Sequence, residues 1–368
     1  MQTQENLSIV LIYEGRLGSS RADSTFVLKN ARCFSKISQT AIWVSKREGW
    51  NIPDSVLNEH EVLSLGKRFD PKTLVSSIFH QLLFGLAIRR NLSREPLGVK
   101  KTRVLIFHDW WPLIPLITLR KRKPIVVLEV HRSLPQLLVR LGAFSHINLL
   151  VATNKFKFKE LLPSFEGKII YERNAVDLSD YKLANFKAAS SPKERISILY
   201  TGSLGVEKNP EILITISAQM PTVDFIVVGS SPRQFKKKDL PNNLILLGSK
   251  PHAQIPQFQV GADFLLITLN PSVAQSSIYT STMKLFEYIA AKRPIIAPNL
   301  ASVLEVLDLD EFYSYDADSV DSLKNAIHLA IKELAKPRLP RISHLDSISW
   351  EDRNNRIVSE FLRICNKY

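Results

Sequence analysis

Cysteine is scarce in this chain of 368 residues, which has two, Cys33 and Cys365, near opposite ends of the sequence. Small disulfide-stabilised domains carry cysteine at a much higher density, and zinc sites place their ligands at short, regular spacings. The sequence therefore gives no indication of a disulfide scaffold or a zinc site. Its low cysteine content is typical of a reducing compartment.

Long apolar runs are also missing, because no stretch of about 18 consecutive apolar residues occurs. The first residues, MQTQENLSIVLIY, lead directly into an apolar strand. They lack the basic segment followed by an apolar segment that is typical of a signal peptide. We therefore expect a cytoplasmic protein, which would lie on the surface of any membrane that it meets.

Several well-known catalytic arrangements are absent as well. The sequence shows no pair of carboxylates at glycosidase-like positions, no Ser-His-Asp order of a hydrolase triad, and no histidines clustered at metal-ligand spacing. Internal repeats of short period and low-complexity tracts are absent too. These absences give no support to a glycosidase, a triad hydrolase or a metalloenzyme, and we expect activity without a divalent metal or other cofactor.

Acidic residues are outnumbered, with 35 Asp and Glu against 49 Lys and Arg, which gives a formal net charge of +14. Residues 1–185 hold 28 basic and 16 acidic side chains, an excess of +12, whereas residues 186–368 hold 21 and 19. The basic residues gather at Arg89, Arg90, Arg94, Lys100, Lys101, Arg103 and Arg120–Lys123. Such a surface favours anionic lipid headgroups, nucleic acid or an anionic substrate, and ordinary solvated charge remains open.

The length exceeds what one hydrophobic core usually supports, which favours two domains. Strands are expected at 7–13, 40–46 and 60–65, and in the segments RVLIFHDW, PIVVLEVHRS and INLLVATN. A helix expected at 72–90 has a wide apolar stripe, which fits either contact with the core or docking on a membrane surface. Alternation of strands and helices is typical of a mostly parallel sheet with helices on both faces.

The segment Lys182–Arg195, KLANFKAASSPKER, is rich in Ala, Ser and Lys and has little periodicity, so we interpret it as an interdomain linker. The alternation of strands and helices restarts after it, and the last segment, SWEDRNNRIVSEFLRICNKY, has apolar residues at helical spacing. We predict one Rossmann-like domain at 1–185, a second at 186–345, and a C-terminal helix at 346–368. Two such sheets favour a ligand cleft between them.

The stretch SSIYTSTMKLFEYIAAKRPIIAPN predicts a short helix that leads into a buried strand, IIA. Its apolar residues at helical spacing are Met283, Phe286, Ile289 and Ala290. Ser281 or Thr282 is the expected N-cap, and Pro294 ends the helix. Lys284 and Glu287 project from one side of it.

The pair Lys284 and Glu287 has two interpretations. In the first interpretation, the two side chains form a surface ion pair, which would contribute about 0.3–0.5 kcal/mol. Alternatively, Glu287 accepts hydrogen bonds from a ribose diol, while Lys284 and the N-terminus of the helix face phosphate.

The segment TSTMKLFEYIAAKRPIIA resembles the nucleotide-sugar signature of retaining glycosyltransferases with the two-Rossmann (GT-B) architecture, called group one or family four. The family pattern is approximately S-P-x-K-x-F-E-Y-x-A-x-G-x-P-[IV]-[IV]-A, and Lys284, Glu287 and Pro294 match it. The resemblance implies that Glu287 grips the donor ribose and that Lys284 and Leu285 belong to the donor site. It also implies an α/β fold of two doubly wound domains that face a cleft, with a C-terminal helix that crosses back to the first domain.

The segment YTGSLGVEKNPEILI predicts a strand, a glycine-containing loop and a helix with Asn209 as N-cap and Pro210 in its first turn. Lys208 stands beside the N–H groups of this helix start, which favours a bound diphosphate, although a solvated lysine fits the spacing as well. By the resemblance, Lys208 matches the lysine that binds the donor diphosphate, and Ser203 stands where many members carry Arg. We therefore predict Gly202, Ser203 and Lys208 at the donor site, with Lys208 as a catalytic group.

Two histidines end predicted strands, His108 in FHDWWP and His131 in LEVHRS, where a parallel sheet binds ligands. A structural role also suits such a histidine. The family has a histidine in this context that contacts the donor sugar and its phosphate, and His131 fits it better than His108, so we predict His131 as catalytic. Gly15 and Gly18, after the first strand, either let the backbone approach a substrate or form a tight turn.

The sequence departs from the family pattern at three places. Tyr279 stands eight positions before Glu287, where many members carry an acidic residue near the reacting sugar. Ala175 in ERNAVDLSDY replaces the Gly of P-N-G-V-D-x-x-x-F, and Lys292 and Arg293 stand where the pattern has Gly before its Pro. Because a subset of the family also reads Y-T-S-P-x-K-L-F-E-Y, the tyrosine removes one candidate carboxylate without implying inactivity.

These features lead to one hypothesis, a retaining glycosyltransferase that moves a sugar from a nucleotide-diphosphate sugar to a lipid-linked or saccharide acceptor of polysaccharide synthesis. Helix dipoles and basic side chains would stabilise the leaving group without a metal. We expect the basic first half to hold the enzyme on an anionic membrane, and we expect no nucleic acid partner. Two alternatives stay open, a GT-B nucleotide-sugar epimerase or hydrolase and a non-catalytic protein that binds anionic polymers or lipid.

Overall fold

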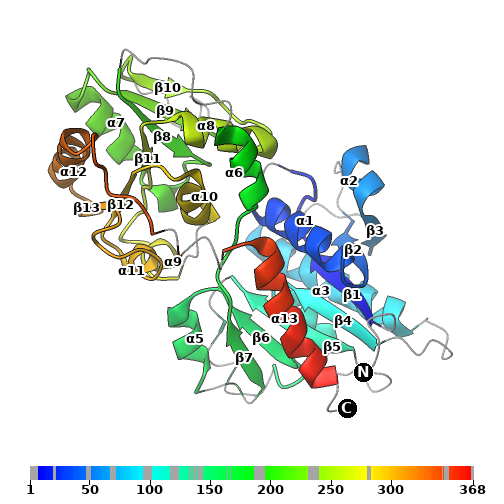
Figure 1. The fold of residues 1–368 in the computed structure, drawn as a ribbon. Coiled ribbons are helices and arrows are strands. Elements are labelled where there is room, and N and C mark those ends of the chain that lie inside the picture. The colour runs from blue at the N-terminus through cyan, green and yellow to red at the C-terminus, as the bar shows by residue number, and fades with distance from the viewer. Residues whose placement is uncertain are drawn as a thin grey trace. The chain divides into compact units, whose positions relative to one another are not determined.

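The computed structural model describes residues 7–19, 22–46, 51–66, 72–93, 102–116, 124–131, 134–135, 139, 144–163, 165, 167–185, 195–230, 240–279, 283–341, 343 and 348–365. Contacts divide the chain into two compact units, each of strands and helices (Figure 1). Unit 1 comprises Met1–Arg173 and Trp350–Tyr368, and unit 2 comprises Asn174–Ser349.

Unit 1 is built on a seven-stranded parallel sheet in the order β3-β2-β1-β4-β5-β6-β7. Its strands are β1 (Leu7–Tyr13), β2 (Gln39–Ser45), β3 (Glu61–Leu65), β4 (Thr102–Phe107), β5 (Ile125–Val130), β6 (Leu149–Ala152) and β7 (Lys168–Tyr171). All seven residues of β1 are buried, as the apolar run LSIVLIY requires of a strand covered on both faces. The strand order reverses between β1 and β4, and open sheets of this kind bind ligands at the carboxyl end of that point.

Helices cover both faces of the unit 1 sheet. They are α1 (Ala22–Ser35), α2 (Asp54–Glu59), α3 (Leu74–Ser93), η2 (Trp111–Leu116), α5 (Lys155–Leu161) and α13 (Trp350–Cys365). Alternate residues of β1 face opposite layers: Ile9 packs with apolar residues of α1 and α13, and Val10 packs with those of α3 and η2. The helix α13 thus lies beside α1 on one face of the sheet (Figure 1).

Unit 2 is built on a six-stranded parallel sheet in the order β10-β9-β8-β11-β12-β13. Its strands are β8 (Ser197–Thr201), β9 (Asp224–Val228), β10 (Leu244–Leu246), β11 (Phe264–Leu266), β12 (Ile295–Pro298) and β13 (Tyr313–Tyr315). The order reverses between β8 and β11, so the loop that follows β8 lies at the expected ligand edge.

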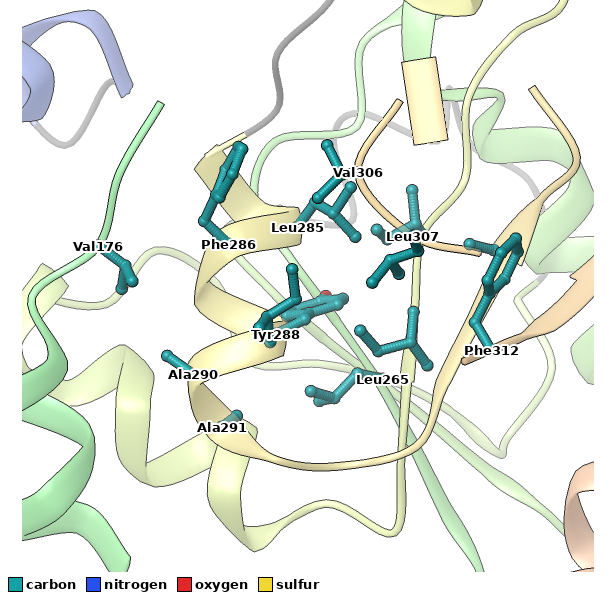
Figure 2. Packing of buried hydrophobic residues seen from close by; sticks show 14 of the residues in the cluster. Val176, Leu265, Leu285, Phe286, Tyr288, Ala290, Ala291, Val306, Leu307 and Phe312 are labelled. Carbon is teal, nitrogen blue, oxygen red and sulfur yellow. The ribbon is translucent and has the colours of Figure 1, made fainter. Parts of the chain in front are cut away.

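Two layers of helices enclose the unit 2 sheet. The elements are α6 (Leu178–Asn185), η3 (Val206–Lys208), α7 (Pro210–Gln219), η5 (His252–Gln254), α8 (Ile255–Gly261), α9 (Ala274–Ser277), α10 (Met283–Ala291), α11 (Ala301–Leu304) and α12 (Val320–Lys332). One core combines α6, α8 and α10, and the other combines α7 and α12. Leu285, Tyr288 and Ala291 of α10 lie in the first core with Leu265 of β11 (Figure 2).

The fold class predicted from the sequence, α/β with two doubly wound parallel sheets, is confirmed. The contacts set other limits than the predicted ones at two points. Unit 2 ends at Ser349 and not at residue 345, and the chain enters unit 2 after Arg173 and not after residue 185. The reason is α6, whose Tyr181 is buried in the core that it shares with α8 and α10. The predicted linker from Lys182 therefore begins inside α6.

Among the described residues, no helix is both long and apolar enough to cross a bilayer.

Candidate functional site

Glycines shape the carboxyl edge of the unit 2 sheet. Gly202, after β8, and Gly229, after β9, have φ angles of 116° and 111°, which favour glycine over residues with a side chain. A Cβ atom on Gly229 would lie 2.8 Å from the carbonyl carbon of Gly202, so the two loops touch through their backbones. Ser230 joins them further, because its Oγ accepts from the Leu204 N–H at 3.0 Å and donates to the Gly202 carbonyl at 3.2 Å.

Lys284, at the start of α10, reaches over this edge. Its Nζ lies 3.4 Å from the centroid of the Tyr200 ring, a cation–π contact, and a Cβ on Gly202 would lie 3.5 Å from the same Nζ. Burial, and then the neighbouring Lys208 ammonium, hold the pKa of Lys284 well below its usual value, although Glu287 and Glu207 act in the opposite direction. Two lysines therefore share this edge and repel each other.

Lys208 ends the short helix η3, immediately before α7. It is partly buried, and burial lowers its pKa, while the adjacent Glu207 carboxylate acts to raise it. Pro210 opens α7 as predicted. The predicted side-chain cap is wrong: Asn209 occupies the N-cap position in a left-handed conformation, with φ 48°, and its amide donates to the Ala317 carbonyl at 3.3 Å and not to the helix.

Glu287, one turn beyond Lys284, is held by hydrogen bonds on both carboxylate oxygens. Gln259 of α8 donates from Nε2 to Oε2 over 3.1 Å, and His252 Nε2 lies 3.2 Å from Oε1. Burial acts to raise the pKa of the Glu287 carboxyl, but the hydrogen bonds from His252 and Gln259 and the Lys284 charge outweigh it. The net pKa is therefore below the ordinary value, and the group is an anion at neutral pH.

A network of buried hydrogen bonds connects to Glu287 through Gln259. The Tyr181 hydroxyl donates to Gln259 Oε1 at 2.5 Å, and Gln259 Nε2 also lies 3.1 Å from Thr201 Oγ1. The Tyr288 hydroxyl accepts from the Thr201 N–H at 3.0 Å, which connects α10 to the end of β8. Side chains of α6, α8, β8 and α10 therefore set the position of this carboxylate.

Other predicted residues of unit 2 have different surroundings. The Leu285 side chain is buried in the core beside Val306 and Leu307, so it packs and does not face a ligand (Figure 2). Ser203 is exposed, and its carbonyl accepts from the Tyr200 hydroxyl at 3.0 Å. The predicted N-cap residues at 281 and 282 lie outside the described part of the chain.

In unit 1, His108 and His131 meet at Glu129 of β5. His108 Nδ1 lies 3.0 Å and His131 Nε2 lies 3.7 Å from the same oxygen, Glu129 Oε2. The register explains this meeting: Phe107 pairs with Leu128 across β4 and β5, so the residues one step further along each strand point to the same face.

Arg353 of α13 balances the Glu129 charge. Its Nη2 lies 2.9 Å from Glu129 Oε1, and both side chains are fully buried. Burial acts to raise the pKa of Glu129, but Arg353 and then the two histidines hold it well below its usual range. Burial lowers the pKa of His131 to about 4 despite the Glu129 carboxylate, so this imidazole is neutral at neutral pH.

Among the described residues, His108, Glu129 and His131 are the group whose ligand atoms, within 4.8 Å of one another, could hold a metal ion. Two cations already contact this cluster: Arg353 pairs with Glu129, and the Lys157 ammonium donates to the His131 carbonyl at 2.6 Å. One carboxylate among two buried cations disfavours a further dication.

The glycines of the first loop have structural reasons to be glycine. Gly18 has φ 78°, and a Cβ there would lie 2.6 Å from Pro53 Cδ. Its N–H donates to Ser24 Oγ at 2.9 Å. A Cβ on Gly15 would overlap the Tyr13 ring. Both observations favour the tight-turn interpretation of this loop.

Comparisons with known proteins give a consistent fold. No family model matches the chain. Sucrose-phosphate synthase from Thermosynechococcus elongatus superimposes with a TM-score of 0.77 and 14% identity over 98% of this chain and 100% of that one. Anabaena HepE, solved with UDP-glucose, gives a TM-score of 0.69 and 14% identity over 97% and 99%. The chain has the GT-B fold.

One curated relative adds a sequence match to the GT-B likeness. It is the UDP-glucuronate:glycolipid 2-beta-glucuronosyltransferase of Xanthomonas campestris pv. campestris, 25% identical over 179 residues. The match spans 49% of this chain and 41% of that protein, so this chain covers less than half of its length.

Within the GT-B chain, the structure brings Gly202, Lys208, Lys284 and Glu287 to one sheet edge, as the motifs suggested. Sequence reasoning missed other participants, namely Tyr181, Gln259, His252, Gly229, Glu129 and Arg353. Two signals were present: Glu129 is a charge inside an apolar strand two residues before His131, and Gly-Ser follows β9 as it follows β8. Gln259 and Arg353 gave no local signal.

Proposed function

We propose that this chain is a retaining glycosyltransferase that uses a nucleotide-diphosphate sugar as donor. The observation that carries the proposal is the meeting of Lys208, Lys284 and Glu287 at the glycine-bearing edge of the unit 2 sheet. Two comparisons support the use of a nucleotide-sugar donor: the structural neighbour HepE was solved with UDP-glucose, and the curated relative is named for UDP-glucuronate. Retention of configuration rests on the resemblance of the central segment to the retaining family.

The charges of this edge suit the two halves of a nucleotide diphosphate. The ionised Glu287 accepts hydrogen bonds from ribose hydroxyls, and such charge-assisted bonds are the stronger ones. Cleavage of the bond between the sugar and the phosphate leaves negative charge on the diphosphate. Lys208 and Lys284, whose mutual repulsion an anion relieves, stabilise that charge. By the same resemblance, we assign neutral His131 to the donor sugar.

We further propose a lipid-linked acceptor, handled by unit 1 at an anionic membrane. The curated relative, named for a glycolipid acceptor, supports this. The excess charge of +12 over residues 1–185 supports it independently. The basic run Arg120–Lys123 lies outside the described residues, whereas α3 is described and presents exposed apolar and basic side chains.

A donor panel of UDP-, GDP- and ADP-sugars, with and without candidate acceptors, tests the activity. Nucleotide release that requires an acceptor, together with a glycosylated product of the donor's anomeric configuration, is the expected result. Release without any acceptor would indicate a hydrolase, and a sugar changed on the donor would indicate an epimerase. We expect undiminished activity after chelation, and activity lost to chelator and restored by magnesium or manganese would contradict the metal-free mechanism.

A further inference from the structure

The Glu287 carboxylate is oriented by two donors from neighbouring elements. Gln259 of α8 donates to Oε2, and His252 of η5 faces Oε1 through Nε2. Because an ionised carboxylate only accepts hydrogen bonds, the His252 nitrogen that faces it carries a proton. Each oxygen of Glu287 therefore has one donor that is present before any ligand binds.

The Gln259 amide cannot turn freely. Its Oε1 accepts from the Tyr181 hydroxyl at 2.5 Å, and its Nε2 lies 3.1 Å from Thr201 Oγ1 and 3.1 Å from Glu287 Oε2. The residue is completely buried, and so is most of Tyr181. A flipped amide would place Nε2 against the Tyr181 hydroxyl and Oε1 against the carboxylate, where two acceptors repel. This arrangement holds Glu287 Oε2 in one position.

The number of acceptor positions then limits the ligand. An ionised carboxylate offers about four positions for hydrogen-bond donors, two on each oxygen. In the described part of the chain, Gln259 and His252 occupy one on each oxygen, which leaves one on each. The side chain of Glu287 is 12% exposed and that of His252 is 39% exposed, so the open side is the side of His252. One free position on each oxygen matches the two adjacent hydroxyls of a ribose.

We propose that His252 and Gln259 are positioning residues that direct Glu287 at both hydroxyls of the donor ribose, and that they thereby select ribonucleotides over deoxyribonucleotides. The inference rests on the proposed function, in which Glu287 binds the ribose. It adds two residues outside the recognised motifs and a property, discrimination at the 2′ position, that depends on them.

Calorimetry with two matched ligands tests the proposal on the full chain. UDP, GDP and ADP are titrated first, and the nucleotide that binds most tightly is compared with its 2′-deoxy form. We expect the wild type to prefer the ribonucleotide by at least about tenfold, the loss of one charge-assisted hydrogen bond. His252→Ala and Gln259→Met should each lower this ratio by at least about threefold. Tyr181→Phe, which frees the Gln259 amide, should lower it in the same direction.

The ratio separates positioning from general loosening of unit 2. A substitution that only disturbs packing weakens both ligands equally, so affinities that fall with an unchanged ratio would overturn the proposal. His252→Gln, which keeps an N–H donor, should restore most of the ratio. His328→Ala removes an exposed histidine of α12 and should leave the ratio as in the wild type.

Failure of the inference is distinct from failure of the proposed function. If the wild type binds none of the nucleotides, the proposed function fails and the inference fails with it. If it binds one of them but does not discriminate against the 2′-deoxy form, only the orientation of Glu287 toward the diol is overturned. Should Gln259→Met fail to fold, as judged by circular dichroism, His252→Ala and Tyr181→Phe still decide the matter.

Discussion

Glu287 and Lys208 carry opposite charges at the glycine-bearing edge of unit 2, and each should contribute to the transition state of transfer. We predict that Glu287→Gln and Lys208→Ala each lower kcat/KM by at least about tenfold, because each removes roughly 1.4 kcal/mol or more of charge-assisted binding. Steady-state kinetics with the best donor measure this. Lys336→Ala, which removes an exposed lysine of unit 2, is the control. Unchanged kinetics in either variant would remove that residue from the site.

Single residues also set a pH dependence of stability in unit 1. The pKa of His131 falls from its ordinary value of 6.5 to about 4 in the folded chain, because desolvation of the partly buried ring penalises its charged form. Between these values the unfolded chain binds a proton that the folded chain does not, so stability rises with pH over this window and falls as the pH drops. Glu129 adds to this loss of stability at lower pH. Arg353 lowers the pKa of Glu129 in the folded chain against the effect of burial, so the folded chain also loses stability as the pH drops below the unfolded carboxyl pKa of about 4.3.

We therefore predict that the melting temperature of unit 1 decreases as the pH is lowered from about 7 to about 5. The decrease should be smaller in His131→Gln, whose side chain cannot titrate. Thermal unfolding at several pH values, followed by tryptophan fluorescence, measures this. The signal is specific, because all five tryptophans belong to unit 1. Parallel curves for the two proteins would show that His131 does not carry the effect.

At the scale of elements, α13 completes unit 1 through one buried ion pair and an apolar face. Arg353→Met should destabilise unit 1 by about 3–5 kcal/mol, since it leaves the Glu129 charge buried and unbalanced. Arg353→Met combined with Glu129→Gln should recover a large part of that loss. Arg363→Met on the exposed side of the same helix breaks an i,i+3 pair with Glu360 and should cost less than about 0.5 kcal/mol.

Urea unfolding followed by tryptophan fluorescence gives these free energies for unit 1. Equal losses for Arg353→Met and Arg363→Met would contradict the buried-pair argument. A double variant as unstable as Arg353→Met alone would contradict it as well, because the remaining defect would then lie in packing and not in charge.

Some helices and strands could be predicted from the sequence because local residue patterns determine them. The helix α10 and strand β12 follow from apolar periodicity ended by Pro294, and β1 follows from an unbroken apolar run. The helix α6 was taken in part for a linker, since its segment has weak amphipathicity and forms mainly through contacts with α8 and α10. Tertiary packing overrides local propensity in such a segment.

The site residues likewise fall into those marked by a local motif and those brought in by the fold. The meeting of Lys208, Lys284 and Glu287 at one sheet edge was predictable because each residue stands in a contiguous motif, whereas their part in a donor site stays a prediction. The partner of Glu129 was not, because Arg353 lies 224 residues away and only the packing of α13 brings it there. The donors to Glu287 are likewise set by the fold: Gln259 is 28 residues distant and sits on a different helix.

At the scale of the whole molecule, charge and exposed apolar area together predict where the protein works. On α3, Val75, Phe79, Leu86 and Arg90 recur at a spacing that places them on one side of the helix, and all four are exposed. Val75 is 76% and Phe79 56% exposed, unusual values for such side chains. An apolar strip that ends in a cation suits the interface of an anionic bilayer, where each nearby Lys or Arg contributes about 1 kcal/mol.

We predict that the protein cosediments with vesicles that contain anionic lipid but not with neutral vesicles. Binding should weaken as the salt concentration rises, since exposed charges are screened within about 8 Å at physiological ionic strength. Val75→Ser with Phe79→Ser should lower the partition coefficient at least about tenfold. Leu309→Ser, at a leucine of unit 2 that is 52% exposed, should leave it unchanged. If the wild type stays in the supernatant with anionic vesicles at low salt, or the α3 variant binds as well as the wild type, membrane docking through this face is wrong. A soluble acceptor then becomes the better hypothesis.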